Sequence, residues 1–279
     1  MDYDDDTFYA QDLEKLIIKD KKYHSKRKKI FLCIFIPLII CILIGVVILI
    51  LISIKRGGKI FCKYNTTKDK ETIRLININS DIEFSLIIDD NTYDKSDSYT
   101  FENAGLHSVT FHFKNKLDSL KGFFKGIINL IEVDFSNLIT EYIKSMEDLF
   151  NSCTNLIKVN FDNATPNLEN TKNMFFDCTS LININLNFDT LKVSQMDFMF
   201  YYCQELTYLD ISNFQLENLV NSQSMFHGCG KLKEILFNDK TRTKNLKIVN
   251  SMFKNCQSLE YINTKIFVTK KNNKIKQRF

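Results

Sequence analysis

The apolar residues in the second half of the chain recur at a fixed spacing. Met146, Leu149, Phe150 and Cys153 occupy positions i, i+3, i+4 and i+7, and five further copies follow this spacing, some with substitutions. Because residues three and four apart share one face of an α-helix, the spacing predicts a short helix in each copy. The copies begin in steps of 26, 25, 25, 26 and 27 residues, at Leu120, Met146, Thr171, Met196, Ser222 and Val249.

The second part of each unit has a different period. In the unit that begins at Met196, Leu206, Leu209 and Ile211 are apolar, and the polar Asp210 separates the last two. This alternation predicts a short strand. A unit of about 25 residues cannot bury its apolar side alone, so neighbouring units must stack. The sequence therefore predicts an α/β leucine-rich-repeat solenoid at 119–264, with about six repeats of parallel strands and short helices.

The region at 55–118 is predicted to be β-rich. Its residues alternate with period two and include many β-branched side chains, and turn residues separate the candidate strands. The stretch resembles a small immunoglobulin-like sandwich that would cap the repeats. His107 and His112 fall on opposite faces of the last strand, so they cannot hold a metal ion together. The candidate strands are 73–78, 82–88, 99–101 and 107–113.

Residues 30–54 are predicted to form a transmembrane helix. These 25 residues carry no charge and would extend about 37 Å as a helix, more than the roughly 30 Å hydrocarbon core. A buried helix of a soluble protein and a cleaved signal peptide are the alternatives, but an uncleaved signal anchor fits the length and the flanks better. Seven Lys and Arg residues lie within 19–29 and four within 55–65. This bias predicts a cytosolic N-terminus and repeats outside, at the plasma membrane or an internal membrane.

Two kinds of short motif suggest processing or sorting. Asp12, Leu16 and Ile17 resemble an acidic di-leucine sorting motif in the predicted cytosolic tail, 1–29, although an ordinary amphipathic turn has the same pattern. Asn65 and Asn163 each begin a glycosylation acceptor sequence. The last segment, 265–279, is predicted to be a basic C-terminal cap or tail.

The repeats resemble those of the BspA-type leucine-rich-repeat surface proteins. The resemblance covers residues 120–264 and rests on a Met-Phe-x-x-Cys-x-x-Leu pattern followed by Leu-x-Leu-Ser-x-Phe. Residues 199–214 carry this pattern with Ile211 at the second Leu of the latter part. The resemblance implies display at the cell surface and binding or adhesion, but no particular ligand.

Five cysteines occupy the same position in successive repeats. Their spacing lacks the close pairs that zinc sites use. They form either disulfides between neighbouring units or a buried ladder of free thiols; parallel side-chain directions and the odd number favour the ladder. These residues are Cys153, Cys178, Cys203, Cys229 and Cys256.

The outward positions of the predicted strands form a candidate binding face. Stacking would align them in two columns, of the kind that repeat proteins use for recognition, although a solvated face has the same pattern. The residues are Glu132, Asp134, Lys158, Asn160, Asn183, Asn185, Tyr208, Asp210, Glu234, Leu236, Tyr261 and Asn263.

These observations predict a binding or adhesion protein that recognises an extracellular protein or glycan. The alternative is a structural or receptor-like membrane component whose tail directs sorting. No catalytic motif is found, so we expect no enzyme activity, no cofactor and no metal. The formal net charge of +4 and the lack of a basic face in the repeats argue against a nucleic-acid partner.

Overall fold

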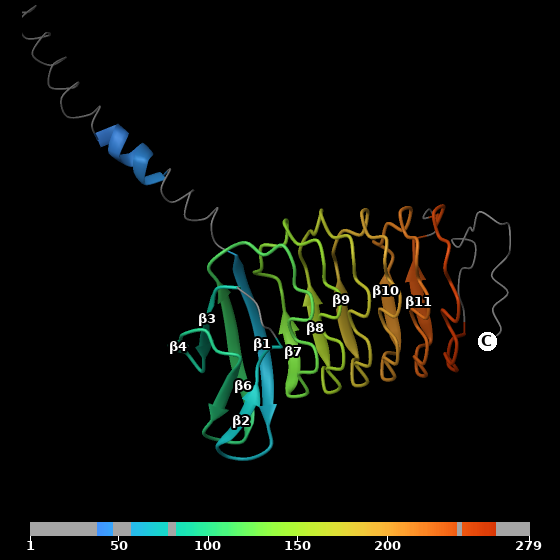
Figure 1. The fold of residues 1–279 in the computed structure, drawn as a ribbon, viewed down its shortest axis with the longest axis horizontal. Helices are drawn as coiled ribbons and strands as arrows, with labels where there is room; N and C mark the ends of the chain where they lie inside the picture. Colours follow the sequence, from blue (N-terminus) through green and yellow to red (C-terminus); the bar gives the residue numbers. More distant parts are fainter. Residues whose placement is uncertain (1–37, 47–56, 78–81, 239–241, 261–279) are drawn as a thin grey trace, which may run out of the picture. The chain divides into compact units, whose positions relative to one another are not determined.

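The computed structural model describes residues 38–46, 57–77, 82–238 and 242–260 (Figure 1). The chain divides into two compact units, 1–55 and 56–279. In the first unit residues 38–46 form a helix. Every strand among the described residues belongs to the second unit.

The prediction of a single-pass membrane protein is wrong. Within the ranges just given, no helix combines the length and the apolar character that crossing a membrane requires. Of the predicted span at 30–54, the structure describes 38–46, and the remainder lies outside the described residues. The signal anchor, the plasma-membrane location and the outward orientation of the repeats are therefore not retained.

In the part of the chain that the structure describes, six strands precede the repeats. In the first, third and sixth of them, side chains alternate between buried and outward positions. In the first strand Ile60, Cys62 and Tyr64 are buried, whereas Phe61 is exposed. The strands are β1 (Gly58–Thr66), β2 (Glu71–Arg74), β3 (Phe84–Ile88), β4 (Asn91–Tyr93), β5 (Ser98–Phe101) and β6 (Gly105–Phe113).

The immunoglobulin-like sandwich is also a wrong prediction. The strands β4, β3, β6 and β1 lie in that order in one sheet that continues into the repeats, and β2 and β5 form a separate two-stranded ribbon. The four predicted strands overlap β2, β3, β5 and β6, but the alternation analysis missed β1 and β4. The missed strand β1 begins at Gly58.

The strand β1 connects the two parts of the second unit. It pairs antiparallel with β6 on one side and with β7 on the other. Parallel pairing then continues from β7 to β8 and β9, and separately from β10 to β11. The repeat strands are β7 (Leu130–Asp134), β8 (Lys158–Phe161), β9 (Asn183–Leu186), β10 (Tyr208–Ile211) and β11 (Glu234–Phe237).

The predicted α/β solenoid is wrong because no helix is found at the described positions of the repeats. Leu149 N donates to Met146 O at 3.2 Å and Asn151 N donates to Asp148 O at 3.1 Å, which are the i+3 contacts of successive turns. In an α-helix, Phe150 N would donate to Met146 O. Instead it donates to Met174 O in the next coil, at 2.9 Å. The coils are thus built from turns whose alternate amides bond to a neighbour.

Two residues of every coil have a left-handed backbone, which a right-handed helix cannot accommodate. They lie four positions apart, and most are Gly, Asn, Asp or Ser, the residues that tolerate positive φ or favour turns. These residues favour turns in place of the predicted helix, and the spacing of the buried apolar residues stays the same. The first set is Gly122, Asp148, Asn173, Phe198, Ser224 and Ser251, and the second is Gly126, Ser152, Asp177, Tyr202, Gly228 and Asn255.

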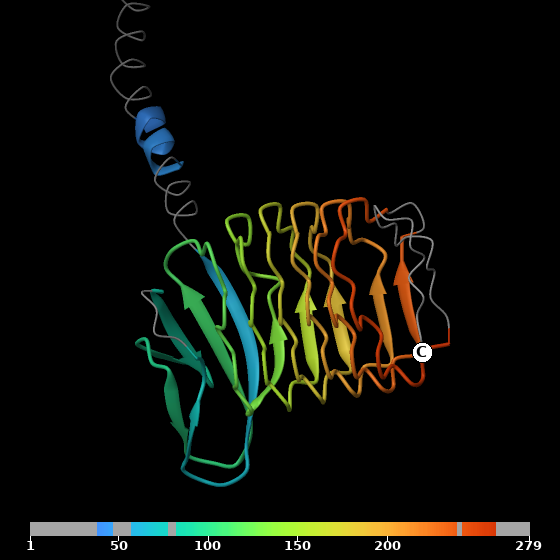
Figure 2. The same ribbon diagram turned by 45° about the vertical axis from the view of Figure 1, so that its right-hand side comes forward.

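A second ladder confirms the repeat steps. Isolated parallel bridges link Ser119, Ser145, Asn170, Gln195, Asn221 and Ile248 in succession. The coils lie side by side in both views of the ribbon (Figures 1 and 2). Inside them the phenylalanine that follows each first left-handed position by two residues is buried and stacks on its neighbours, with ring centroids 5.3 Å apart for Phe150 and Phe175 and 5.4 Å apart for Phe175 and Phe200.

The repeat cysteines are free and buried, which confirms the predicted ladder of thiols. Each thiol also donates a hydrogen bond to the carbonyl of a core phenylalanine in the preceding coil, a role that the sequence did not predict. Burial raises the pKa of Cys153 to about 12, so these thiols stay protonated donors near neutral pH. The bonds run from Cys153 to Phe124 (2.9 Å), Cys178 to Phe150 (3.1 Å), Cys203 to Phe175 (3.2 Å), Cys229 to Phe200 (3.0 Å) and Cys256 to Phe226 (2.9 Å).

Candidate functional site: the outer face of the sheet

The outward side chains of β6, β1, β7, β8 and β9 form one continuous surface, here called the sheet face. Strand register aligns them in rows across the sheet. One row contains Ser108, Lys63, Glu132, Lys158 and Asn183 in order. The next contains Thr110, Phe61, Asp134, Asn160 and Asn185. The predicted columns of the repeats therefore extend onto strands that precede the repeats.

A hollow of about 510 Å³ lies on the sheet face where β1 meets the repeats. Phe61 contributes an apolar wall and is 38% exposed. Polar walls come from both parts of the chain, because Ser108 and Thr110 lie on β6 and Lys158 lies on β8. A volume of this size falls in the range of sites that bind small ligands or side chains of a partner.

Three charged side chains of the sheet face, those of Lys63, Glu132 and Asp134, are paired or hydrogen-bonded. Lys63 Nζ lies 3.0 Å from Glu132 Oε2, and both side chains are partly exposed. Asp134 Oδ1 accepts a hydrogen bond from Asn160 Nδ2 at 3.1 Å, and Asn160 Oδ1 accepts one from Asn185 Nδ2 at 2.8 Å. These contacts fix the side chains in one orientation and leave polar edges toward solvent. The face can therefore present ordered donors and acceptors without a strong net charge.

The predicted columns continue on β10 and β11, which form their own two-stranded sheet. Tyr208 pairs in register with Glu234, and Asp210 with Leu236. Tyr208 is 46% exposed and Leu236 is 37% exposed. Limited burial, and then the carboxylates of Asp210 and Glu234, raise the pKa of Tyr208, which keeps its hydroxyl a donor. The last two predicted face residues, Tyr261 and Asn263, lie outside the described residues.

The two predicted glycosylation sites differ in their surroundings. The Asn65 side chain is exposed, while its backbone carbonyl accepts a hydrogen bond from Asn129 Nδ2 at 2.8 Å. Asn163 is partly buried, and its side-chain amide donates to the carbonyls of Phe135 and Leu138. Asn163 thus helps to connect two coils. Use of either asparagine as an acceptor stays a prediction, and the sorting motif of Asp12, Leu16 and Ile17 lies outside the described residues.

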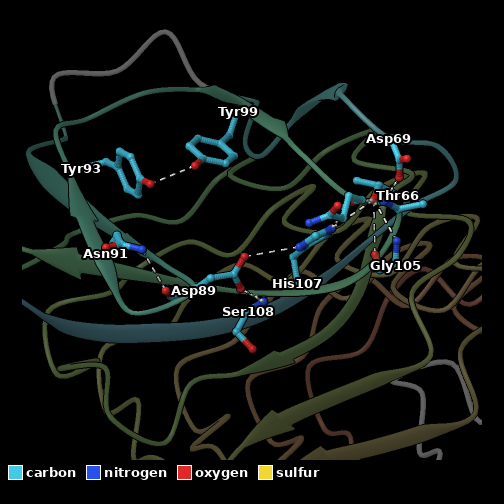
Figure 3. A network of polar contacts seen from close by, with 11 residues as sticks. Thr66, Asp69, Asp89, Asn91, Tyr93, Tyr99, Gly105, His107 and Ser108 are labelled. Carbon is cyan, nitrogen blue, oxygen red and sulfur yellow. Dashed lines mark hydrogen bonds and ion pairs between the residues drawn. The ribbon is translucent and has the colours of Figure 1, made fainter.

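A polar network surrounds His107, which lies near the start of β6 (Figure 3). Its Nδ1 lies 3.4 Å from Asp89 Oδ2, and its Nε2 lies 3.1 Å from Thr66 Oγ1 and 3.0 Å from Asn103 O. A carboxylate, an imidazole and a hydroxyl in this order are the parts of an activated nucleophile. However, Thr66 is buried, and its Oγ1 accepts a hydrogen bond from Gly105 N at 3.1 Å.

The network is better explained as a structural connection. The ring of Phe101 stacks on His107 with centroids 4.0 Å apart, which covers the imidazole. Together these contacts connect the end of β1, the turn after β3 and the turn between β5 and β6 (Figure 3). A substrate has no access to a hydroxyl that is buried against backbone, so we assign no chemistry to this cluster. The absence of enzyme activity stays a prediction.

In the described part of the chain, no group of three or more His, Cys, Asp or Glu side chains is arranged to hold a metal ion. The thiols lie in the core and donate to carbonyls, and His107 and His112 lie on opposite faces of β6. The residues of this candidate site that the sequence reasoning missed include Phe61 and Lys63, since β1 was not recognised as a strand next to the repeats.

Comparison with known proteins identifies one family. Residues 117–239 and 144–266 match the model of a family described as Mycoplasma protein of unknown function, DUF285. The two overlapping matches together cover more than half of the chain and coincide with the coils, which carry the part of the sheet face on β7, β8 and β9. No curated protein and no solved structure matches the chain.

Proposed function

We propose that this chain, which belongs to the DUF285 family, is a binding module that recognises a protein or a glycan through its sheet face. The observation that carries the proposal is the hollow of about 510 Å³, which coincides with the outward columns of β7 and β8. The family description assigns no activity, and the chemistry of this surface supports the proposed function.

The sheet face has the composition of a recognition surface. Phe61 supplies an exposed aromatic ring, which is the kind of side chain that anchors interfaces. The amide of Asn160 is oriented by bonds on both sides, so it loses little conformational freedom when a ligand binds. Lys63 and Glu132 balance each other, which favours a polar or mixed ligand over a strongly charged one.

The resemblance to BspA-type leucine-rich-repeat surface proteins supports the same function. Its motif residues, such as Met199, Phe200 and Cys203, form the core of the coils, and the variable positions between them face outward. A constant core with variable outward side chains is the arrangement by which repeat proteins acquire new ligands. The resemblance suggests no ligand in particular.

The proposal is tested by probing protein and glycan arrays with the full chain, followed by variants of the sheet face. Phe61→Ala and Lys158→Glu should each weaken binding to a retained ligand at least tenfold, because hot spots of an interface contribute about 1.4 kcal/mol or more. Leu191→Ala is the matched control, since Leu191 is 46% exposed and does not line the hollow. Ligands that bind both variants as tightly as the wild-type chain would show that the sheet face is not the site.

A further inference from the structure

A cluster of aromatic rings lies on the turns of three neighbouring coils, away from the strands. It consists of Phe176, Phe198, Tyr201, Tyr202 and His227, all partly exposed. Phe176 and Tyr201 stack with centroids 4.7 Å apart, and Tyr201 and His227 lie 4.8 Å apart. Tyr202 stacks on His227 with centroids 5.8 Å apart. These partly exposed rings lie on turns and are not part of the buried phenylalanine stack. Together they form a surface that we call the aromatic platform.

Two of these rings occupy backbone positions that are unfavourable for them. Phe198 and Tyr202 have φ values of 56° and 58°, in the left-handed region. A bulky side chain there is a genuine outlier. The other coils place Gly, Asp, Asn or Ser at both equivalent positions, as Asp148 and Ser152 do. One coil alone therefore carries two aromatic residues where the local structure favours small or turn-forming residues.

This departure from local preference points to selection for something other than folding. Strained residues persist where the surrounding structure holds them, and they concentrate at binding sites. Gly228 lies beneath the ring of Tyr202, where an added Cβ would approach the ring within 3.0 Å. The neighbouring coil thus accommodates the ring, and the platform is built from more than one coil.

A hollow of about 480 Å³ adjoins the platform. Tyr202 forms one wall, and the side-chain amides of Gln204, Asn255 and Gln257 line the others. An ion pair completes the lining, with Lys231 Nζ 2.6 Å from a Glu205 carboxylate oxygen. This hollow shares no lining residue with the hollow on the sheet face.

We propose that the aromatic platform and this hollow form a saccharide-binding site, separate from the sheet face. A sugar ring presents C–H groups on its faces and hydroxyl groups around its rim. Aromatic rings pack against the faces, and side-chain amides both donate to and accept from hydroxyls. Glu205 and Lys231 neutralise each other, so the site has no excess charge for an ionic ligand.

A proline-rich peptide is the competing ligand, because such segments dock on grooves lined by aromatic residues. Proline lacks a backbone N–H, so a proline-rich segment would leave the oxygen atoms of the lining amides without a hydrogen-bond donor. The polar walls therefore favour a ligand dense in hydroxyl groups over a peptide. Burial, and then the charge of Lys254, lower the pKa of His227, which is consistent with a neutral platform.

The test uses the full chain on an array of neutral oligosaccharides and proline-rich peptides. We expect retention of a saccharide, which calorimetry then measures. Tyr202→Asn introduces the residue type that the last coil uses at this position, and it should weaken saccharide binding at least tenfold without lowering the melting temperature by more than about 2 °C, because relief of backbone strain offsets the lost ring contacts. Gln204→Ala, at an exposed position, should weaken binding several-fold and leave the fold intact.

Two controls make the outcome decisive. Ser152→Asn changes the same position two coils before Tyr202, outside the lining of this hollow, and should bind the saccharide as the wild-type chain does. Phe61→Ala, which alters the sheet face, should also leave this binding unchanged. The proposal fails if the wild-type chain retains no saccharide or retains only peptides, if Gln204→Ala binds normally, or if Phe61→Ala removes the binding. If Tyr202→Asn does not fold, the Gln204→Ala result decides alone.

Discussion

The two parts of the second unit bury similar side chains by different routes. In the region before the repeats, the main strands pair antiparallel, and successive side chains alternate between core and solvent. In the coils, the strands are four or five residues long, and the backbone bonds connect residues about 25 positions apart. Local alternation could therefore indicate four of the six strands in the first region, whereas the second region requires knowledge of which segment lies beside each turn.

This difference explains why the apolar pattern of the repeats predicted the buried positions correctly but predicted helices where the structure has turns. Leu149, Phe150 and Cys153 are buried as a helix face would be. Yet their amides bond alternately within the turn and to the next coil. Apolar spacing reports which side chains are buried, and it does not report where the backbone hydrogen bonds go.

The largest effect should come from removing a ring of the phenylalanine stack. Phe175→Ala should lower the free energy of unfolding by about 3–5 kcal/mol, because a fully buried ring leaves a cavity. Chemical denaturation of the full chain measures it, and Phe61→Ala, on the exposed side of β1, should change stability far less. A loss below about 1 kcal/mol for Phe175→Ala would mean that the coils are not held together by this stack.

A smaller loss should follow from a change where the two regions join. Gly58 has φ +89°, and a Cβ added there would lie 2.8 Å from Ile139 N and 2.9 Å from Leu138 Cα. Gly58→Ala should therefore destabilise the protein by about 2–3 kcal/mol through backbone strain and overpacking. Gly105→Ala is the control for strain alone, because Gly105 has φ +130° and open space around its Cβ position. Equal losses for the two variants would argue that β1 does not pack closely on the first coil.

A carboxylate that connects three coils gives a pH-dependent prediction. Burial tends to raise the pKa of Asp148, but hydrogen bonds from Asn151, Lys125 and Asn173 outweigh it, so the pKa is lowered. Because the folded state favours the ionised form, this stabilisation is present above the ordinary carboxyl range and is lost as pH falls below about 4. Asp148→Asn should cost about 1 kcal/mol at pH 7.

The melting temperatures of the wild-type chain and Asp148→Asn between pH 7 and pH 3 check this prediction. The difference between the two proteins should shrink as the pH falls, because the wild-type chain then loses the same charge. A difference that stays constant over this range would mean that the negative charge contributes nothing.

The smallest effect on stability should come from the ion pair between the two regions. Lys63 and Glu132 are both partly exposed, so Lys63→Met should change the free energy of unfolding by less than about 0.5 kcal/mol. The same change should weaken binding at the sheet face, which separates a role in recognition from a role in folding. If Lys63→Met caused a large loss of stability and left binding unchanged, Lys63 would have a role in folding and not in recognition.

The sequence predicted the repeat spacing, the buried positions and the thiol ladder. It did not predict the turns, although residues such as Gly122, Asp177 and Ser224 signalled left-handed positions. Those residues are also common on exposed helix faces and at helix ends, so the signal is clear only when the six coils are aligned. Phe198 and Tyr202 obscure it further, because they violate the preference that the other coils follow.

For the candidate site, the columns on β7 to β9 could be predicted and the hollow could not. The hollow depends on Phe61 and Lys63, which pair with β7 from about 70 positions upstream in the chain. Nothing in the local pattern indicates which edge of the repeats such a strand covers. Long-range antiparallel pairing of this kind requires the three-dimensional structure.

The position of β1 fixes one end of the coil array and leaves its length adjustable. Since β1 runs antiparallel along the free edge of β7, an extra coil placed before β7 would displace it. A segment of about 25 residues duplicated between β8 and β9 would instead find the same ring, thiol and amide partners on both sides. Gene duplication can therefore lengthen this surface by one coil at a time, while β1 keeps its place at the first coil. Relatives with different numbers of coils would share the hollow beside β1 and differ in the length of the coil array.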